Sequence, residues 1–300
     1  MGPRISVIIP VYREEGRINA LIDHVRMRGY GHDPEIVIVD GDPGRNTLAA
    51  VDRGGVVAVP ASKGRGRQLN AGAAASRGEI LLFLHADCGL PAGAFEAVTG
   101  ALLDGAAAGA FRFGVRSRKW RYRLIEAGAR CRNALTRTPY GDQAQFTRRD
   151  VFTAVGGFPE TPIMEDVAFM RRVKRAYGRS KIALLPLRTL VSPRRWEAEG
   201  ALYCVLRNQY LIVSYLLGVS PERLAGLYPP LPDGESDGMP CGLSDGAPGN
   251  PASAETVGQP VGQTSEKASG RASGHATDRA EDPAGSRVER MDGAGDGDGR

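Results

Sequence analysis

The sequence predicts an α/β domain in which helices flank a mainly parallel sheet. Four short runs are apolar on both faces, at residues 5–11, 36–39, 56–59 and 80–84. Helical patterns at residues 17–28 and 68–76 lie between the first two runs and between the last two. Strands that are buried on both faces and alternate with helices are typical of βαβ units, whose crossovers cover a parallel sheet.

The following residues predict elements of a different character. Residues 110–115 indicate another strand and residues 118–135 a basic helix, whereas residues 141–158 are polar and punctuated by glycine, which favours a loop region. Residues 165–177 predict a helix with acids in its first turn and arginines later, the order that the helix dipole favours. A last folded segment covers residues 198–227, with a helix over 198–217.

Composition divides the chain near residue 230. Residues 231–300 contain no aromatic residue and consist mostly of Gly, Ala, Ser, Asp, Pro and Glu. Such a segment buries too little apolar surface to offset its ordering entropy. We therefore expect one domain over residues 1–230, with halves at 1–115 and 116–200 and C-terminal helices at 201–230. A disordered acidic tail over residues 231–300 follows it.

Charge divides at the same place. The tail holds 13 acidic and 6 basic residues, a net charge of −7, whereas the whole chain carries +5, so residues 1–230 carry +12. A basic domain indicates an anionic partner: nucleic acid, a membrane surface or a phosphorylated small molecule. We expect no nucleic acid, because the basic helix is accompanied by no recognised binding module.

Cysteine usage and hydropathy indicate the compartment. Cys88, Cys131, Cys204 and Cys241 form no Cys-x-x-Cys pair, which argues against a disulfide framework or a structural zinc site. The first eleven residues lack the pattern of a signal peptide, and no apolar stretch reaches the roughly 18 residues of a membrane span. We expect a cytoplasmic protein, with peripheral contact at the inner membrane face through the basic and C-terminal helices.

Polar side chains follow the end of each predicted strand. They are Tyr12 and Glu14 after the first strand, Asp40 and Asp42 after the second, Lys63, Arg65 and Arg67 after the third, and His85 and Asp87 after the fourth. In open α/β sheets, ligands bind beyond the carboxyl ends of the strands. The sequence therefore predicts a binding site at this edge, where two acidic pairs and a basic loop meet.

His85 and Asp87 are candidate metal ligands. They stand two residues apart in an extended turn, so that both side chains can point the same way. A carboxylate there can hold Mg²⁺ or Mn²⁺ together with substrate phosphates. The alternative is that Asp87 caps a helix that begins near Pro91.

Glu165 and Asp166 are the candidate catalytic acids. A carboxylate at the start of this helix can act as general base on an acceptor hydroxyl. The alternative is that these first-turn acids stabilise the helix N-terminus.

The chain resembles glycosyltransferase family 2, an inverting family with the GT-A fold. The residues that carry the resemblance are Val7 to Glu14 (VIIPVYRE), residues 38–42 (IVDGD), residues 64–72 (GRGRQLNAG), residues 78–87 (GEILLFLHAD), Gly156-Gly157-Phe158 and Met164-Glu165-Asp166-Val167. Their order and spacing extend over about residues 4–200. The Leu-His-Ala-Asp motif is similar to that of a small bacterial subgroup whose members accompany radical-SAM genes.

The resemblance implies a role for each matching position. The GT-A fold implies a mixed, mainly parallel sheet that carries a nucleotide-sugar pocket. Pro10, Tyr12 and Glu14 match the segment that lines this pocket, Asp40 matches the acid that recognises the base, and Arg65 or Arg67 would contact the base or diphosphate. Asn70 would support the loop, Asp87 matches the metal-binding acid, and Asp166 matches the catalytic base.

Two positions depart from the family pattern. The family usually has an acid that contacts the ribose or the metal where His85 stands, and an imidazole suits Mn²⁺ better than Mg²⁺. The segment from Ser192 to Trp196 resembles the Gln-x-x-Arg-Trp element of processive relatives but has Ser for Gln, and this resemblance makes Arg195 and Trp196 candidate substrate- or nucleotide-binding residues. No transmembrane pattern accompanies it, so we expect no polymer synthesis.

The sequence thus predicts a metal-dependent glycosyltransferase of the hexosyltransferase type. Its donor would be a nucleotide-sugar, a UDP-sugar by family analogy, and its acceptor a small molecule or a lipid. One alternative is a sugar-phosphate nucleotidyltransferase, although residues 10–15 lack the Gly-rich loop that such enzymes place after the first strand. Another is a non-catalytic nucleotide-sugar-binding protein, which the presence of Asp87 and Asp166 argues against.

Overall fold

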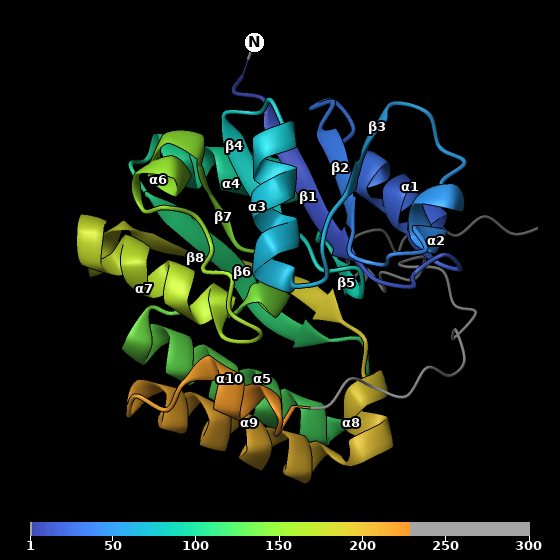
Figure 1. Cartoon of the computed structure of the whole chain (residues 1–300). Coiled ribbons are helices and arrows are strands. Elements are labelled where there is room, and N and C mark those ends of the chain that lie inside the picture. The colour runs from blue at the N-terminus through green and yellow to red at the C-terminus, as the bar shows by residue number, and fades with distance from the viewer. Residues whose placement is uncertain (1, 229–300) are drawn as a thin grey trace, which may run out of the picture. The chain divides into compact units, whose positions relative to one another are not determined.

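The structure of the chain is a computed structural model that describes residues 2–228. The prediction of a disordered tail over residues 231–300 lies outside the described residues. Figure 1 shows helices on both sides of one twisted sheet. The strands have the order β3-β2-β1-β4-β7-β6-β8-β5.

The first four strands form the parallel half of the sheet. They are β1 (Ile5–Val11), β2 (Glu35–Asp40), β3 (Val56–Pro60) and β4 (Ile80–Phe83). β1 pairs in parallel with β2 and β4, and β2 pairs in parallel with β3. All four strands lie within about one residue of the predicted runs.

The second half of the sheet is mixed. Its strands are β5 (Cys88–Gly89), β6 (Ala108–Val115), β7 (Phe146–Arg148) and β8 (Ile182–Val191). β7 pairs antiparallel with both β4 and β6, whereas β8 pairs in parallel with β6 and antiparallel with β5. The prediction of an α/β domain with a mixed, mainly parallel sheet flanked by helices is therefore confirmed.

Helices cover the sheet on both faces. One core contains residues of α1 (Ile18–Arg28), α4 (Ala94–Leu103) and α5 (Trp120–Thr136), and the other contains residues of α3 (Arg65–Ala75), α6 (Arg149–Ala154) and α7 (Glu165–Tyr177). Val7 and Ile9 of β1 belong to the first core and Ile8 to the second. This alternation is the period of a strand that is buried on both faces.

Glycine lets α3 approach the sheet closely. A Cβ at Gly72 would lie 2.4 Å from Cγ2 of Ile8 and 2.8 Å from Cγ2 of Val39. Real Cβ atoms do not come so close, so only glycine allows the helix backbone this position. The second half of α3 therefore packs directly on β1 and β2.

The remaining helices are short, except for α9. They are α2 (Asn46–Ala49), α8 (Arg194–Glu199), α9 (Ala201–Leu216) and α10 (Pro221–Ala225), with 3-10 turns at Gly141–Gln143 and Arg179–Lys181. Within residues 2–228, no helix combines the length and apolar character that a membrane crossing requires.

Two local predictions are wrong. Residues 141–158 are not only loop, because they contain β7 and α6. Asp87 does not cap a helix near Pro91: the next helix, α4, begins at Ala94, its N-cap is Gly93, and no side chain bonds to that cap. The helix-cap alternative for Asp87 is therefore excluded.

Candidate active site

The candidate site lies where the parallel strands end beneath α3. Gln68 Nε2 donates hydrogen bonds of 2.8 Å to the carbonyls of both Val11 and Val39. These carbonyls belong to the last residue of β1 and to the neighbour of the last residue of β2. The buried Gln68 therefore ties two strand ends to one helix and fixes the edge that carries the candidate residues.

Asp40 shapes the loop that follows β2. Its carboxylate is fully buried and accepts hydrogen bonds from the backbone N–H groups of Asp42, at 2.9 Å, and Leu48, at 3.2 Å. Backbone donors satisfy a buried carboxylate without a cationic partner. Asp40 thereby sets the path of residues 41–48, while its predicted contact with a nucleotide base remains a prediction.

The residues of the first strand and the following loop that are predicted to line the nucleotide-sugar pocket lie at the same edge. Pro10 lies opposite Val39 in the sheet, and Lys63 Nζ stands 4.5 Å from the centre of the Tyr12 ring. The backbone N–H of Glu14 donates to Thr47 Oγ1 at 3.0 Å. Burial raises the pKa of the Glu14 carboxyl, and the charge of Asp87 adds to this rise while Arg17 opposes it. Glu14 and Asp87 are therefore electrostatic neighbours, although 73 positions separate them in the sequence.

Asn70 holds the loop that leads to α7. Its side-chain amide donates to the carbonyl of Phe158 at 2.9 Å and accepts from the N–H of the same residue at 3.0 Å. The Phe158 ring packs against Phe83 and Phe169, with centroids 4.8 and 4.6 Å away. Arg67 adds an exposed ion pair with Glu160 at 3.0 Å, which contributes little by itself. The polar contacts of Asn70 and the aromatic packing together fix the approach to Glu165.

Glu165 and Arg65 form an ion pair between the starts of α7 and α3. Arg65 Nη1 lies 3.2 Å from Glu165 Oε1, and the Glu165 side chain is only 1% exposed. Burial raises the pKa of Glu165, whereas the guanidinium of Arg65 favours its charged form. Because a buried carboxylate needs such a partner, Glu165 positions Arg65 at the rim of the site.

Asp166 is linked directly to the 3-10 turn at Gly141. Its Oδ2 accepts a 2.6 Å hydrogen bond from the Gly141 N–H, and its Oδ1 accepts one of 2.7 Å from Val167 in its own helix. The contact with Val167 is the helix-stabilising role that the sequence left open. The contact with Gly141 brings Asp166 together with residues from the other side of the sheet.

Gly141 also contacts His85. A Cβ at position 141 would lie 2.9 Å from Nε2 of His85 and 3.2 Å from Oδ2 of Asp166. His85, Gly141 and Asp166 are therefore in contact, and no larger residue fits between them. Burial and the charge of Arg65 lower the pKa of His85 to about 4, so the imidazole is neutral at neutral pH.

His85, Asp87 and Cys88 form the group that could hold a metal. One ligand atom from each lies within 4.8 Å of the others. The Cys88 thiol is buried and donates to Asp87 Oδ1 at 3.3 Å, whereas the Asp87 side chain is exposed at the edge. An exposed carboxylate beside a neutral imidazole suits a divalent ion that shares its coordination with a ligand. The residues present therefore fit Mn²⁺ or Mg²⁺ at Asp87.

The sequence did not single out Asp142 and Gln143, which complete the site. Gln143 is fully buried: its Oε1 accepts from Asn133 Nδ2, Arg132 Nη2 and the Tyr140 N–H, and its Nε2 donates to the Phe111 carbonyl. These bonds fix the turn that presents Gly141 and Asp142. The only signal for these residues in the sequence was a polar Gly-Asp-Gln triplet next to buried strands. The role of this triplet depends on contacts with elements that are distant in the sequence.

Asp142 is an acid of this site with one buried carboxylate oxygen, Oδ1, that lacks a hydrogen-bond partner within residues 2–228. Burial raises the pKa of Asp142 to about 7; Arg132 opposes this rise, whereas Asp166 and Asp87 add to it. The negative charges of Asp166 and Asp87 thus act on the carboxylate of Asp142 at the turn. A cation or a ligand hydroxyl bound there would reduce the repulsion between these carboxylates.

Arg195 and Trp196 belong to α8, the helix that follows β8. Trp196 packs against Phe113 and Tyr122, with ring centroids 5.7 and 6.1 Å away. Arg195 pairs with Glu199 at 3.2 Å and stands 4.4 Å from the centre of the Tyr228 ring. The Trp196 contacts are core packing, and a contact of either residue with a nucleotide remains a prediction.

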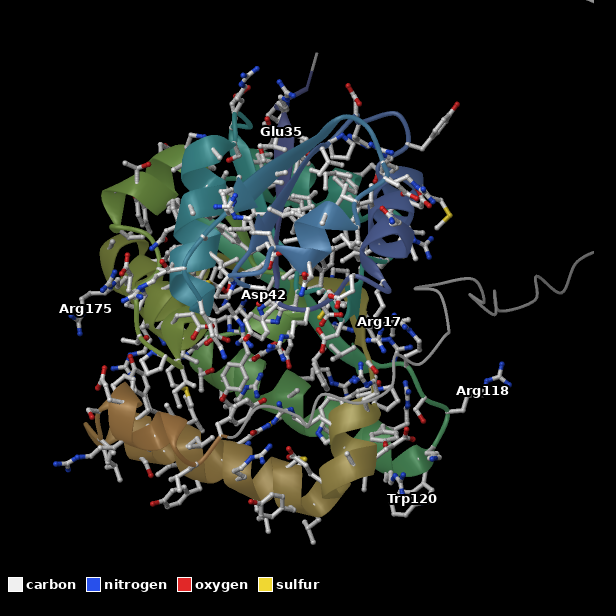
Figure 2. All side chains as sticks on the ribbon, turned by 45° about the vertical axis from the view of Figure 1, so that its right-hand side comes forward. Arg17, Glu35, Asp42, Arg118, Trp120 and Arg175 are labelled. Carbon is white, nitrogen blue, oxygen red and sulfur yellow. The ribbon has the colours of Figure 1, made fainter. Side chains whose placement is uncertain are left out.

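Figure 2 shows Asp42 and Arg17 in the middle of the molecule, at the level where the strands of the parallel half end. The side chains there come from the loops after β1 and β2 and from the start of α1. In that view, α8 and α9 lie below this level. The candidate residues therefore gather at one edge, as expected for an open α/β sheet.

A known protein family and several solved structures are similar to this chain. The model of the family described as glycosyl transferase family 2 matches residues 6–159. One similar solved structure is glucosyl-3-phosphoglycerate synthase from Mycobacterium tuberculosis with Mn²⁺, UDP and glucosyl-3-phosphoglycerate; it is 20% identical, covers 62% of this chain and 71% of that chain, and has a TM-score of 0.49. The same synthase with Mg²⁺ and UDP is 21% identical, with 62% and 70% covered and a TM-score of 0.47. No curated protein matches the chain.

Asp142 should make the metal-free protein less stable as pH rises. Its pKa is raised from 3.8 to about 7 in the folded state, so the folded protein binds more protons than the unfolded chain between these values. The free energy of unfolding then falls with rising pH across this window. Asp142→Asn should remove that fall, so the wild type should lose stability relative to this variant as pH rises.

Urea unfolding in EDTA at a series of pH values measures this difference. Asp150→Asn is the control, because Arg148 holds the pKa of Asp150 below 3.8 and its titration lies outside the window. Parallel stability curves for the wild type and Asp142→Asn between about pH 4 and about pH 7 would contradict the prediction.

Proposed function

Because the chain belongs to glycosyltransferase family 2, we propose that it transfers a sugar from a nucleotide-diphosphate donor to an acceptor hydroxyl. The donor we propose is a UDP-sugar, by analogy within the family. The observation that carries the proposal is the contact of Asp166 with Gly141 and, through it, with His85 beside Asp87. This contact joins a candidate base to a candidate metal acid across the sheet.

The donor would bind along the ends of the parallel strands. Tyr12 and Glu14 would line the nucleotide pocket, and the loop that Asp40 shapes would face the base. Arg65 is oriented by Glu165 and remains half-exposed, at 50%, so that it can contact a diphosphate. Guanidinium groups bind phosphate oxygens through paired hydrogen bonds.

A divalent ion would bind Asp87, with His85 as a second ligand. When bound, such an ion supplies positive charge to the leaving diphosphate. Arg65 contributes to the same stabilisation from the protein, and fixed charges of this kind are usually the largest catalytic contribution. The neutral imidazole of His85 adds no charge that would repel the ion.

Asp166 would act as the base. The acceptor oxygen bonds to the anomeric carbon, the bond from that carbon to the diphosphate oxygen breaks, and the acceptor proton passes to the Asp166 carboxylate. The Gly141 N–H holds Oδ2 of Asp166 in place, and a positioned carboxylate is what this proton transfer needs. A direct displacement of this kind inverts the anomeric centre. Asp142, with its unpartnered Oδ1, is a candidate partner for a substrate hydroxyl.

Two substitutions test the proposal. Asp87→Ala and Asp166→Asn should each lower the rate of UDP release from a UDP-sugar with Mn²⁺ by about 10²-fold or more, because one weakens ion binding and the other removes the base. Asp104→Ala, an exposed acid at the end of α4, is the matched control and should retain full activity.

The products of this assay and of a second one distinguish the alternatives. With UTP and a sugar 1-phosphate in place of the UDP-sugar, release of pyrophosphate would indicate a nucleotidyltransferase. Binding of UDP-sugar without any release would indicate a non-catalytic binding protein. Wild-type activity in Asp166→Asn would contradict the role of that acid.

We also propose that α9 rests on a membrane surface, which would admit a lipid acceptor. The residues that α9 buries are small or polar with one exception: Cys204, Arg207, Leu211 and Ser214. Most of its large apolar residues face solvent instead: Leu202, Tyr203, Leu206, Tyr210, Val213 and Leu216, followed by Leu217. A helix that buries polar residues and exposes apolar ones is suited to lie in a membrane interface. Cys88, Cys131 and Cys204 form no disulfide within residues 2–228, which suits the reducing cytoplasmic side.

Vesicle flotation tests this contact. Vesicles of phosphatidylglycerol should carry the wild type with them, and the double substitution Leu202→Ser and Leu206→Ser should abolish flotation because it removes apolar surface that would enter the interface. Leu103→Ser is the matched control, since Leu103 is 75% exposed on α4. Equal flotation of the double variant and the wild type would exclude α9 as the contact.

A further inference from the structure

A hollow lined by none of the candidate active-site residues lies between α7, α9 and α10. Its volume is about 410 Å³. The lining comes from the loop before α7 (Pro159 and Thr161), from one face of α7, and from Tyr215 and Pro221 of the C-terminal helices. A cavity of this size is in the range of small-ligand sites.

Three arginines of α7 line this hollow. Arg171, Arg172 and Arg175 stand on one side of the helix, while Phe169, Met170 and Val173 are buried on the other. Figure 2 shows Arg175 at the outer rim of α7, on the left of the view. The lining contains no acid, and within residues 2–228 none of the three arginines forms an ion pair. Glu222, which follows Pro221, makes no ion pair with them in this part of the chain either.

The charge of this cluster affects its neighbours. Burial lowers the pKa of Lys174, and the positive charges of Arg171 and Arg179 lower it further. Like charges held close together without counter-ions raise the electrostatic energy of the fold. An anion in the hollow would lower that energy.

Contacts with uncharged groups hold two of the arginines in place. Arg172 Nη1 donates to the Gly157 carbonyl at 3.3 Å, and the Arg171 guanidinium stands 5.9 Å from the centre of the Tyr215 ring. Neither contact neutralises the positive charge, and each restricts the side chain before any ligand arrives. Restricting side chains in advance lowers the entropy cost of binding.

We infer that this hollow is a binding site for a phosphate-bearing anion, separate from the donor site at Asp87. Several guanidinium groups around one cavity are the arrangement that recognises phosphate oxygens through paired, charge-assisted hydrogen bonds. The volume admits a phosphate together with a small organic group. The ligand is either a soluble phosphorylated compound or the headgroup of an anionic lipid, since Tyr215, which lines the hollow, is next to the exposed Leu216 at the end of α9.

The hollow is also connected to the active site through the chain. Pro159 and Thr161 form one wall of it, and the same loop continues into Glu165 and Asp166. Gly157, whose carbonyl orients Arg172, precedes Phe158, which Asn70 holds. A bound anion would therefore stabilise the loop that positions the candidate base.

Calorimetric titration with inorganic phosphate tests the site. It is carried out in EDTA, at constant ionic strength and without donor, so that neither a metal nor transfer activity contributes. The wild type should bind phosphate saturably. Arg175→Gln and Arg171→Gln should each weaken binding by about tenfold or more, because each removes charge-assisted hydrogen bonds.

Two matched variants and a vesicle arm complete the test. Arg130→Gln, at an exposed position of α5, and Arg65→Gln, in the donor site, should bind phosphate like the wild type. If free phosphate does not bind but phosphatidylglycerol vesicles bind in a way that Arg175→Gln abolishes, the ligand is a lipid headgroup. Loss of phosphate binding in Arg65→Gln with retention in Arg175→Gln would place the anion in the donor site and overturn the inference. The absence of any Arg175-dependent binding of phosphate or vesicles would also overturn the inference.

Discussion

The hydrogen bond from the Gly141 N–H to Asp166 Oδ2, 2.6 Å long, connects the two halves of the candidate active site. Asp166 begins a helix on one face of the sheet, whereas Gly141 belongs to a turn that Gln143 anchors to β6 and α5. The absence of a side chain at Gly141 lets His85 from the end of β4 reach the same point. Close packing around one glycine thus brings together an acid and an imidazole from distant parts of the sequence. The candidate metal ligand Asp87 has a ligand atom within 4.8 Å of one of that imidazole.

The rest of the fold supports this contact through α3. Gln68 ties the ends of β1 and β2 to the helix, and Asn70 fixes Phe158 in the loop before α7. Arg65, at the first position of the same helix, pairs with Glu165. One helix therefore contacts the strand ends through the buried amide of Gln68 and the start of α7 through Arg65. These contacts explain why polar residues occur in a helix that packs on a sheet.

The sequence predicted the parts of this structure that depend on local patterns. The strands β1 to β4 were found because their residues are apolar on both faces, and α7 was found because its acids and arginines follow the helix dipole. β8 was not predicted, since Pro186 and Arg188 interrupt its apolar pattern and both face solvent. Proline is tolerated in a strand where its missing N–H removes no needed ladder bond.

The same division applies to the site. The common location of Asp40, His85 and Asp87 could be predicted, because these residues follow parallel strands and the ends of parallel strands share one edge. Asp142 was missed because its raised pKa arises from burial and from Asp166 and Asp87, and no local pattern encodes such contacts. The pairing of Arg65 with Glu165, 100 positions later, and the arginine-lined hollow of α7 likewise depend on tertiary packing.

The most direct measurement is anomalous diffraction from a crystal of the protein with Mn²⁺ and UDP. The account predicts a manganese peak roughly 2 Å from a carboxylate oxygen of Asp87, with the UDP diphosphate bound to the same ion. A manganese peak at another group of residues, or UDP bound at the strand ends with no ion at Asp87, would contradict the account.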